Sequence, residues 1–227
     1  MSIIGAFGYV LWAFVYFAWI YRAFRDRAPA APMVAVCCNF SWEVLDVFAF
    51  PNPNPQFVFL GRAWLVIDVV ILWQLLRYGP ALQTVPLRRR FYRPMVGFLL
   101  ILGLTGQYAF VSMYQDVVGI VISYVIVLIM SIAFILMFLS RIAQGHRRGI
   151  SITAGWLKLV GSVFSAVHGH FLVHWCNPHL PNVSLMDFLF AAIFIFDCAY
   201  VAMLHAPQSW LRALVEPDRN LSVEVAS

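Results

Sequence analysis

Seven apolar stretches, each close to the length that crosses a lipid bilayer, occupy most of this chain. A transmembrane helix needs about 20 predominantly apolar residues. Turns that contain proline or glycine separate the stretches, as expected for short connections between helices. The stretches cover residues 3–21, 33–50, 60–77, 95–111, 117–139, 152–175 and 183–205.

The composition agrees with a membrane protein and excludes most soluble classes. Of the 227 residues, 63% are hydrophobic and 11% are charged, whereas soluble domains carry about 25% charged residues. Such a chain is not a disordered segment, a disulfide-stapled module or a nucleic-acid binder. The sequence therefore predicts an all-α, polytopic membrane protein with a bundle of seven transmembrane helices over residues 1–206. Residues 207–227 are expected to form a short polar C-terminal tail.

The distribution of basic residues predicts the orientation in the membrane. Assigning Lys and Arg to alternate sides gives fourteen residues on one side and Arg62 alone on the other. Cytoplasmic loops carry the excess of positive charge, so we expect the N-terminus outside and the C-terminus in the cytoplasm. The first stretch is not a signal peptide, because its arginines, Arg22, Arg25 and Arg27, follow it rather than precede it.

Four carboxyl side chains are predicted at membrane depth, where a charged residue costs about 2.5–3.5 kcal/mol and is a functional candidate. They are Glu43, Asp46, Asp68 and Asp197. At 1.5 Å per residue, Glu43 and Asp197 lie roughly 15 and 12 Å from the cytoplasmic ends of their helices. We therefore expect these two acids near the midplane, with Asp46 and Asp68 nearer the outer surface.

Helical spacing groups these acids with other polar side chains. Asn39, Glu43 and Asp46 follow one another at four and three residues, and Asp197 shares a face with Tyr200. No arginine is expected at this depth, and Lys158 is expected near the cytoplasmic end of its helix. Unpaired carboxyls in an apolar bundle are expected to be partly protonated, which suits acid catalysis or proton-coupled transport. For Asp46 and Asp68, hydrogen bonding between helices is an equally good interpretation.

Two further groups of residues have weaker interpretations. His168, His170, His174, Cys176 and His179 could bind a metal, although interfacial histidines explain them better; no nucleotide or Mg²⁺–diphosphate motif occurs, so no cofactor is expected. Some aromatic residues could face a cation, although packing and interface belts also explain each of them. These residues are Trp42, Trp64, Trp73, Tyr108, Tyr124 and Trp156.

One segment resembles a known family. The run Cys37-Cys38-Asn39-Phe40-Ser41-Trp42-Glu43 is similar to a motif of the small integral-membrane terpene cyclases of fungal meroterpenoid and indole-terpenoid pathways and of bacterial drimentine-type pathways. The resemblance extends from about residue 5 to residue 205. Its other matches are Arg77-Tyr78-Gly79-Pro80, Leu139-Ser140-Arg141, Arg148-Gly149, the segment 156–161 and Asp197-Cys198-Ala199-Tyr200.

The resemblance implies an enzyme that needs no metal or nucleotide. Such enzymes fold a prenyl chain, protonate its terminal alkene or epoxide and direct a carbocation cascade. It implies that Glu43 and Asp197 are the essential acids, with Asn39, Trp42, Asp46, Trp64, Asp68, Tyr108 and Tyr200 at the substrate. The short N-terminus resembles the bacterial members, so a farnesylated substrate and a bacterial cell membrane are expected. A proton-coupled small-molecule transporter or a receptor is the alternative, and a structural assembly partner would leave the buried acids unexplained.

Overall fold

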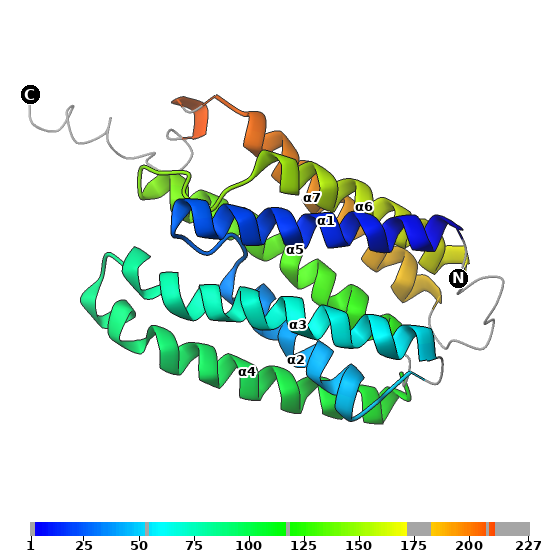
Figure 1. Cartoon of the computed structure of the whole chain (residues 1–227). Helices are drawn as coiled ribbons and strands as arrows, with labels where there is room; N and C mark the ends of the chain where they lie inside the picture. The colour runs from blue at the N-terminus through cyan, green and yellow to red at the C-terminus, as the bar shows by residue number, and fades with distance from the viewer. Residues whose placement is uncertain (1–2, 53–54, 117–118, 172–182, 208, 212–227) are drawn as a thin grey trace, which may run out of the picture.

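The computed structural model describes residues 3–52, 55–116, 119–171, 183–207 and 209–211, and these residues form helices and no strand. The long helices are numbered α1 to α7, and a 3₁₀ turn, η1, connects α3 with α4 (Figure 1). Their bounds are α1 Ile3–Asp26, α2 Met33–Phe48, α3 Pro55–Tyr78, η1 Pro80–Leu82, α4 Pro86–Tyr114, α5 Ile120–Ala143, α6 Ile152–Phe171 and α7 Val183–His205.

Five of these helices, α1, α3, α4, α5 and α7, are long and apolar enough to cross a membrane. The chain is therefore an all-helical, multi-pass membrane protein, as the sequence predicts. Helix α2 has 16 residues and rises about 24 Å, which is less than the roughly 30 Å of bilayer hydrocarbon. The count of seven membrane spans and the orientation of the termini stay predictions.

Helix α4 is the element whose start differs most from its apolar stretch. It begins at Pro86, nine residues before the predicted position 95. Proline suits the first turn of a helix, because its missing N–H has no partner there in any case. Apolarity marks only the part of a helix that meets lipid, so the basic first turns of α4 are not visible in a hydrophobicity pattern.

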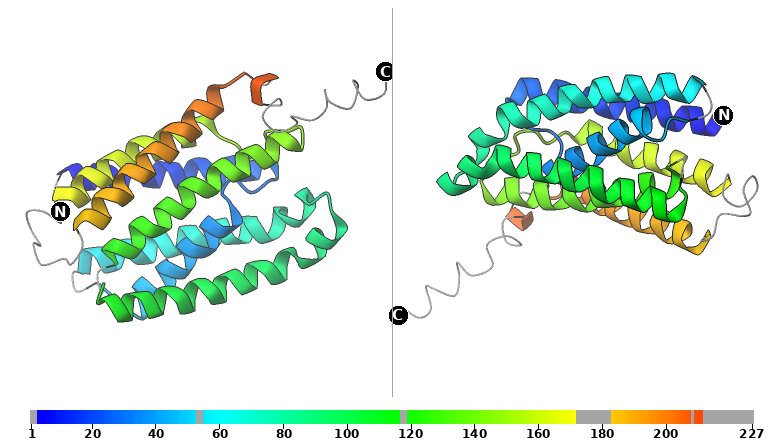
Figure 2. Two further views of the ribbon diagram at one scale, coloured as in Figure 1. Left: turned by 180° about the vertical axis from the view of Figure 1, so that it is seen from behind. Right: turned by 90° about the horizontal axis from the view of Figure 1, so that it is seen from below.

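The helices form two groups joined by α2 and α5 (Figures 1 and 2). In one group, α1 packs along α6, and both α5 and α6 pack against α7. In the other group, α2 packs against α3 and α4. Helix α2 also contacts α5, and α1 contacts α3, so these two contacts connect the groups.

Helices α4 and α5 do not form the close antiparallel hairpin that their short link predicts. They meet at residues 115–119, and α4 then packs chiefly against α2 rather than α5. The left view of Figure 2 shows the two helices diverging from this link, with α2 between them. A short link brings two helix ends together but does not fix the packing of their other turns, and here α2 contacts both α4 and α5.

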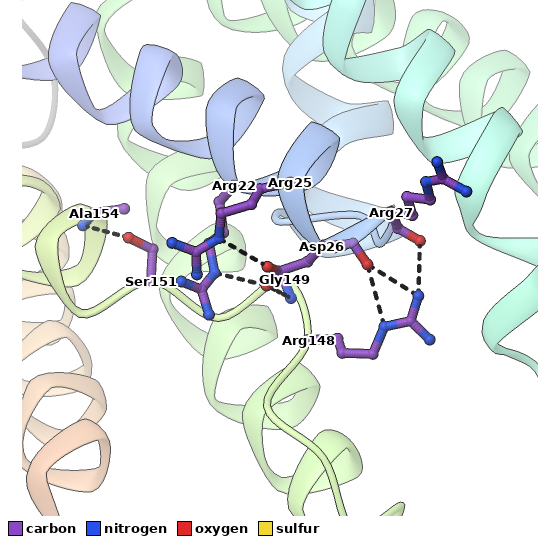
Figure 3. Close-up of polar contacts among 8 residues, drawn as sticks. All are labelled: Arg22, Arg25, Asp26, Arg27, Arg148, Gly149, Ser151 and Ala154. Atoms are coloured by element: carbon purple, nitrogen blue, oxygen red, sulfur yellow. Dashed lines mark hydrogen bonds and ion pairs between the residues drawn. The ribbon is translucent and has the colours of Figure 1, made fainter.

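A polar junction at the end of α1 ties this helix to the connection between α5 and α6 (Figure 3). Asp26 accepts a hydrogen bond from the Gly149 amide at 2.9 Å and forms an ion pair with Arg22 at 2.7 Å. The Arg148 guanidinium donates to the Asp26 carbonyl oxygen, also at 2.9 Å. The Arg148-Gly149 pair, which the sequence matched to a family motif, therefore fixes the position of a loop.

Candidate active site

Carboxyl groups from α2 and α3 gather around Asn39. The amide nitrogen Nδ2 of Asn39 donates to Oδ2 of Asp68 at 2.6 Å, and Asp68 is only 3% exposed. Glu43 lies one turn after Asn39 on α2, is half-buried, and has Asp68 and Asp46 as its charged neighbours. We call Asn39, Glu43, Asp46 and Asp68 the carboxyl cluster.

The carboxyl cluster is more compact than the sequence suggests. Asp46 lies against Gly61 of α3, whose missing side chain leaves room for the carboxylate. The sequence predicts Asp68 nearer the outer surface than Glu43 and gives it no partner, whereas in the structure it pairs with Asn39, one turn before Glu43. The helical stripe on α2 was visible in the sequence, but the register of α3 against α2 was not.

Asp197 lies at a second site, where it has a basic partner. It forms an ion pair with Lys158, and both side chains are only 2% exposed. The Lys158 ammonium also donates to Oγ of the buried Ser131 at 2.8 Å. The expectation that these acids are unpaired is therefore wrong for Asp197.

Depth explains why Lys158 and Asp197 meet. Lys158 is six residues from the start of α6 and Asp197 is eight residues from the end of α7, which corresponds to roughly 9 and 12 Å along the two axes. Because consecutive helices α6 and α7 pack against each other, these positions lie at similar heights. A comparison of depths would have marked this pair as possible, although it does not fix the rotation of the two helices.

One oxygen of Asp197 remains available within the described part of the chain. Its Oδ1 accepts the bond from Lys158, whereas Oδ2 is buried and has no hydrogen-bond partner among the described residues. A buried acceptor without a hydrogen-bond partner is uncommon in native structures, which suggests that this oxygen has a function. Asp197 is therefore ion-paired with Lys158 through Oδ1, and the lone pairs of its Oδ2 are available to accept a proton.

Aromatic side chains connect the two acidic sites. The Trp12 ring lies 5.8 Å from the Lys158 ammonium and 6.3 Å from the Tyr16 ring. Tyr16 packs against Trp64 of α3 at 4.9 Å, and its hydroxyl lies near Asn39 of the carboxyl cluster. We call Trp12, Tyr16 and Trp64 the aromatic wall.

Trp12 and Tyr16 were not among the residues that the sequence singled out, although a signal for them exists. Aromatic residues recur on α1 at spacings of three, four and three, which places them on one face. Such a stripe is more often ordinary core packing, and the spacing gains meaning only when the face meets two acidic sites. The members of the stripe are Tyr9, Trp12, Tyr16 and Trp19.

Three other predicted substrate-binding residues contact apolar side chains. Trp42 is 8% exposed and packs in a cluster with apolar residues of α4 and α5. Tyr108 is half-exposed and its ring lies 5.3 Å from that of Phe50. Tyr200, one turn from Asp197, is buried against Phe134 of α5 at 5.4 Å. A contact of these three residues with substrate stays a prediction.

The remaining candidates lie at the periphery. Trp73 and Trp156 expose about half of their surfaces, and the Tyr124 hydroxyl donates to the Ser165 carbonyl oxygen at 2.6 Å. His170 contacts Asp187 at 3.0 Å, so the histidine patch has an acidic neighbour that the sequence did not indicate. His174, Cys176 and His179 lie outside the described residues, and no metal-ligand cluster of three forms among the others.

Comparison with known proteins places the chain in a family. The model of the Pyr4-like transmembrane terpene cyclases matches residues 2–209. Terpene cyclase cle7 of Aspergillus versicolor is 26% identical over 195 residues, 83% of this chain and 79% of the relative. Terpene cyclase olcD of Penicillium canescens is 29% identical over 194 residues, 83% of this chain and 78% of the relative.

A third relative agrees with this assignment. The Pyr4-family terpene cyclase mfmH of Annulohypoxylon moriforme is 27% identical over 208 residues, 86% of this chain and 79% of the relative. No solved structure matches the chain. Since the family model covers nearly the whole bundle, with the carboxyl cluster, Lys158 and Asp197 inside the matched range, this chain belongs to the Pyr4-like transmembrane terpene cyclases.

Proposed function

We propose that this protein cyclises a farnesylated small molecule by protonating the terminal alkene or epoxide of its prenyl chain. The carbocation cascade that follows would give a meroterpenoid or indole-terpenoid product without a metal. The observation that carries the proposal is the carboxyl cluster beside the aromatic wall, inside a bundle of the terpene cyclase family. Family membership does not favour the transporter alternative.

Glu43 is proposed as the proton donor. Its charged neighbours are carboxyls, and like charges at short range favour a state in which one group keeps its proton. Donation to the terminal carbon or to the epoxide oxygen leaves Glu43 as a carboxylate. The Asn39 amide, one turn away, is positioned to orient the cluster through its bond to Asp68, which supports general acid catalysis.

The aromatic wall is proposed to stabilise the cations that form after protonation. The faces of Trp12, Tyr16 and Trp64 carry negative quadrupole potential, and each cation–π contact contributes about 0.5–2 kcal/mol in a desolvated site. The ring-to-ring distances, 6.3 and 4.9 Å, support a continuous surface along α1 and α3. A cation that migrates along the folded prenyl chain would remain near an aromatic face at each step.

Asp197 is proposed to recover the proton. Lys158 stabilises it as a carboxylate, and its free Oδ2 can accept a proton from a carbon next to the last cation. Loss of that proton forms the final double bond, so protonation and deprotonation balance and the substrate is isomerised. Glu43 and Asp197 would thus act as one catalytic unit with different roles, as donor and acceptor.

The test is product formation by purified variants in detergent. Glu43→Gln and Asp197→Asn keep shape but remove the acid, and each is expected to lower turnover by at least about 100-fold. Their effects should be non-additive in the double variant, as for residues that act as a unit. Asp46→Asn and Asp68→Asn should lower turnover by less than these two variants do. Size-exclusion profiles show whether each variant is folded.

Two results would contradict the proposal. Full activity of Glu43→Gln or of Asp197→Asn would remove the donor–acceptor unit. Loss of turnover on treatment with EDTA, with recovery on adding Mg²⁺ or Zn²⁺, would contradict a reaction that needs no metal.

A further inference from the structure

A cleft of about 610 Å³ lies at the basic end of the bundle, away from the carboxyl cluster. Its lining comes from the start of α2, the end of α3, the start of α4 and the end of α5. The left view of Figure 2 shows that α4 and α5 are far apart at this end, having diverged from their link. The divergence of these two helices therefore opens a cleft in the side of the bundle.

A buried arginine lines this cleft. Arg141, in the last turn of α5, is only 8% exposed, and no ion pair or side-chain hydrogen bond of its guanidinium is found among the described residues. Removing a charged group from water without a counter-ion is costly. The exposed Arg88 of α4 lines the same cleft. We call this site the arginine cleft.

The remainder of the arginine cleft suits an amphiphile rather than a free ion. Its polar lining residues are the buried Tyr92, the partly buried Gln83 and the exposed Gln144, beside the two arginines. Its outer edge carries exposed apolar side chains, Leu87 and Phe91. Most of the other lining residues are apolar, so the cleft combines a few polar groups with an apolar surface, as suits a molecule that carries a polar head group and an apolar chain.

Helix α2 connects the arginine cleft with the carboxyl cluster. Met33 lines the cleft and Glu43 follows ten residues later on α2, which is about 15 Å.

A narrow gap in the packing, too tight to hold a water molecule, adjoins the arginine cleft. It shares Leu75 and Ala31 with the arginine cleft and extends to Trp19 and Ile71. Ile71 lies one turn from Asp68 on α3, and Trp19 lies one turn from Tyr16 on α1. The residues that line this gap therefore lie between the arginine cleft and the helix turns that carry Asp68 and Tyr16.

We propose that the arginine cleft is the head-group subsite for the prenylated substrate, and that it selects an acidic head group such as a carboxylate or an enolate. Arg141 and Arg88 would bind this anion at the membrane interface, while the prenyl chain extends past Leu75 to Glu43. This inference rests on the proposed cyclase function. It adds a substrate class to that function and assigns Arg141 to binding rather than to the chemistry.

The test compares two farnesylated acceptors that differ only in charge: one with an acidic hydroxyl or carboxyl head group, and its O-methylated counterpart. Wild-type protein in nanodiscs of zwitterionic phosphatidylcholine should cyclise the acidic substrate with the lower KM. Arg141→Gln should raise the KM for the acidic substrate by about 10-fold or more, the effect of losing a charged hydrogen bond, and change kcat little. The KM for the methylated substrate should stay within about twofold.

Control variants separate a binding role from a folding role. Arg141→Lys keeps the charge and should recover part of the affinity for the acidic substrate. Arg88→Gln changes an exposed side chain and should reduce the same preference without lowering the melting temperature. Arg89→Gln, an exposed neighbour that does not line the cleft, should leave both KM values unchanged.

The outcomes distinguish this inference from the proposed function. Cyclisation of neither substrate by the wild-type protein would contradict the function itself. Equal KM values for both substrates, or equal losses in Arg141→Gln, would overturn only the head-group subsite. A preference that appears only after anionic lipid is added would assign the arginines to phospholipid and also overturn it.

Discussion

Lys158 gives Asp197 a chemical state that a buried carboxyl would not have alone. Breaking a buried ion pair by removing one partner typically costs about 3–5 kcal/mol, because the other charge is left without compensation. The pair is only 2% exposed on each side, and Ser131 supplies an additional acceptor for the ammonium. The acid that the family resemblance emphasises is therefore structurally dependent on a lysine outside the family's acidic motifs.

The first prediction concerns the stability of this pair. Lys158→Met should lower the free energy of unfolding by about 3 kcal/mol, and Asp197→Asn should also destabilise. The double variant Lys158→Met/Asp197→Asn should be more stable than the sum of the two losses predicts, because neither partner is left charged. Thermal melting in detergent measures all three.

Additive losses in this cycle would mean that the two side chains do not interact. Ser131→Ala is the matched control, because it removes one neighbour of Lys158 but leaves the ion pair. It should cost less than either charge removal, about 1 kcal/mol for one hydrogen bond.

The residues of the site differ in how far the sequence could predict them. Glu43 and Asn39 follow from a stripe within one helix, and Asp197 follows from its depth. The bond from Asn39 to Asp68 joins α2 to α3, and the pair between Lys158 and Asp197 joins α6 to α7. Such contacts depend on the rotation and register of two helices, and periodicity within one helix carries no information about either.

At the scale of elements, the junction between α1 and the connection of α5 to α6 depends on a glycine. Gly149 has φ +79°, a conformation in which side chains are strained, and a Cβ there would collide with the Pro29 carbonyl oxygen. Its amide also donates to Asp26. Backbone conformation and close approach together require glycine at this position.

The second prediction uses this glycine and a neighbour as a matched pair. Gly149→Ala should destabilise the protein by about 2 kcal/mol or more, because strain and collision combine. Gly145→Ala should cost about 1 kcal/mol, because Gly145 has a similar φ of +75° but open space at its Cβ position. Equal melting temperatures for the two variants would contradict the role of the contact with Pro29.

The third prediction concerns pH and the loop between α5 and α6. Burial, and then the nearby Arg141 and Arg148, lower the pKa of His146, and its Nδ1 is buried without a partner in the described structure. The unfolded chain, in which His146 has a pKa of about 6.5, therefore binds more protons near and below that pH. Stability should rise with pH through this window and fall as pH drops below about 6.5.

Melting curves at pH 7.5 and 5.5 check this expectation against His146→Gln. The wild-type protein should lose more stability on acidification than the variant, because carboxyl groups titrate in both and only the histidine differs. Parallel losses in the two proteins would show that protonation of His146 is not linked to unfolding.

Helix positions were far more predictable than helix neighbours. Apolar runs placed α2 and α7 within two residues of their observed ends, because the run and the helix stop at the same turn. The expected α4–α5 hairpin was wrong in its packing, because α2 separates the two helices. Link length limits the distance between two helix ends, whereas the burial of polar groups decides which helices lie side by side.

On the scale of the whole molecule, the two helix groups carry different parts of the site. The carboxyl cluster belongs to α2 and α3, and the ion pair belongs to α6 and α7. Helix α1 packs against both α6 and α3, so the aromatic wall lies where the groups join. The relative position of the two groups therefore sets the distance between the proposed proton donor and acceptor.

The fourth prediction concerns the orientation of this assembly in its membrane. In a background without the native cysteines, Arg89→Cys and Arg147→Cys should react with a membrane-impermeant thiol reagent from the cytoplasmic side only. Gln115→Cys, in the link between α4 and α5, and His179→Cys should react from outside, because the positive charges collect on the opposite face. Labelling of Gln115→Cys from the cytoplasm would reverse the topology.

The short length of α2 affects how the protein is inserted into the membrane during its synthesis. A helix of 16 residues that carries Glu43 and Asp46 partitions poorly on its own, because each acidic side chain at a helix centre adds about 2.5–3.5 kcal/mol to translocon-mediated insertion. Its packing partners α3 and α4 are synthesised later in the chain. Helix α2 would therefore remain near the translocon until α3 and α4 have been synthesised. Substitutions on the faces of α3 or α4 that contact α2 should lower the yield of folded protein, while the turnover number of the molecules that do fold should stay the same.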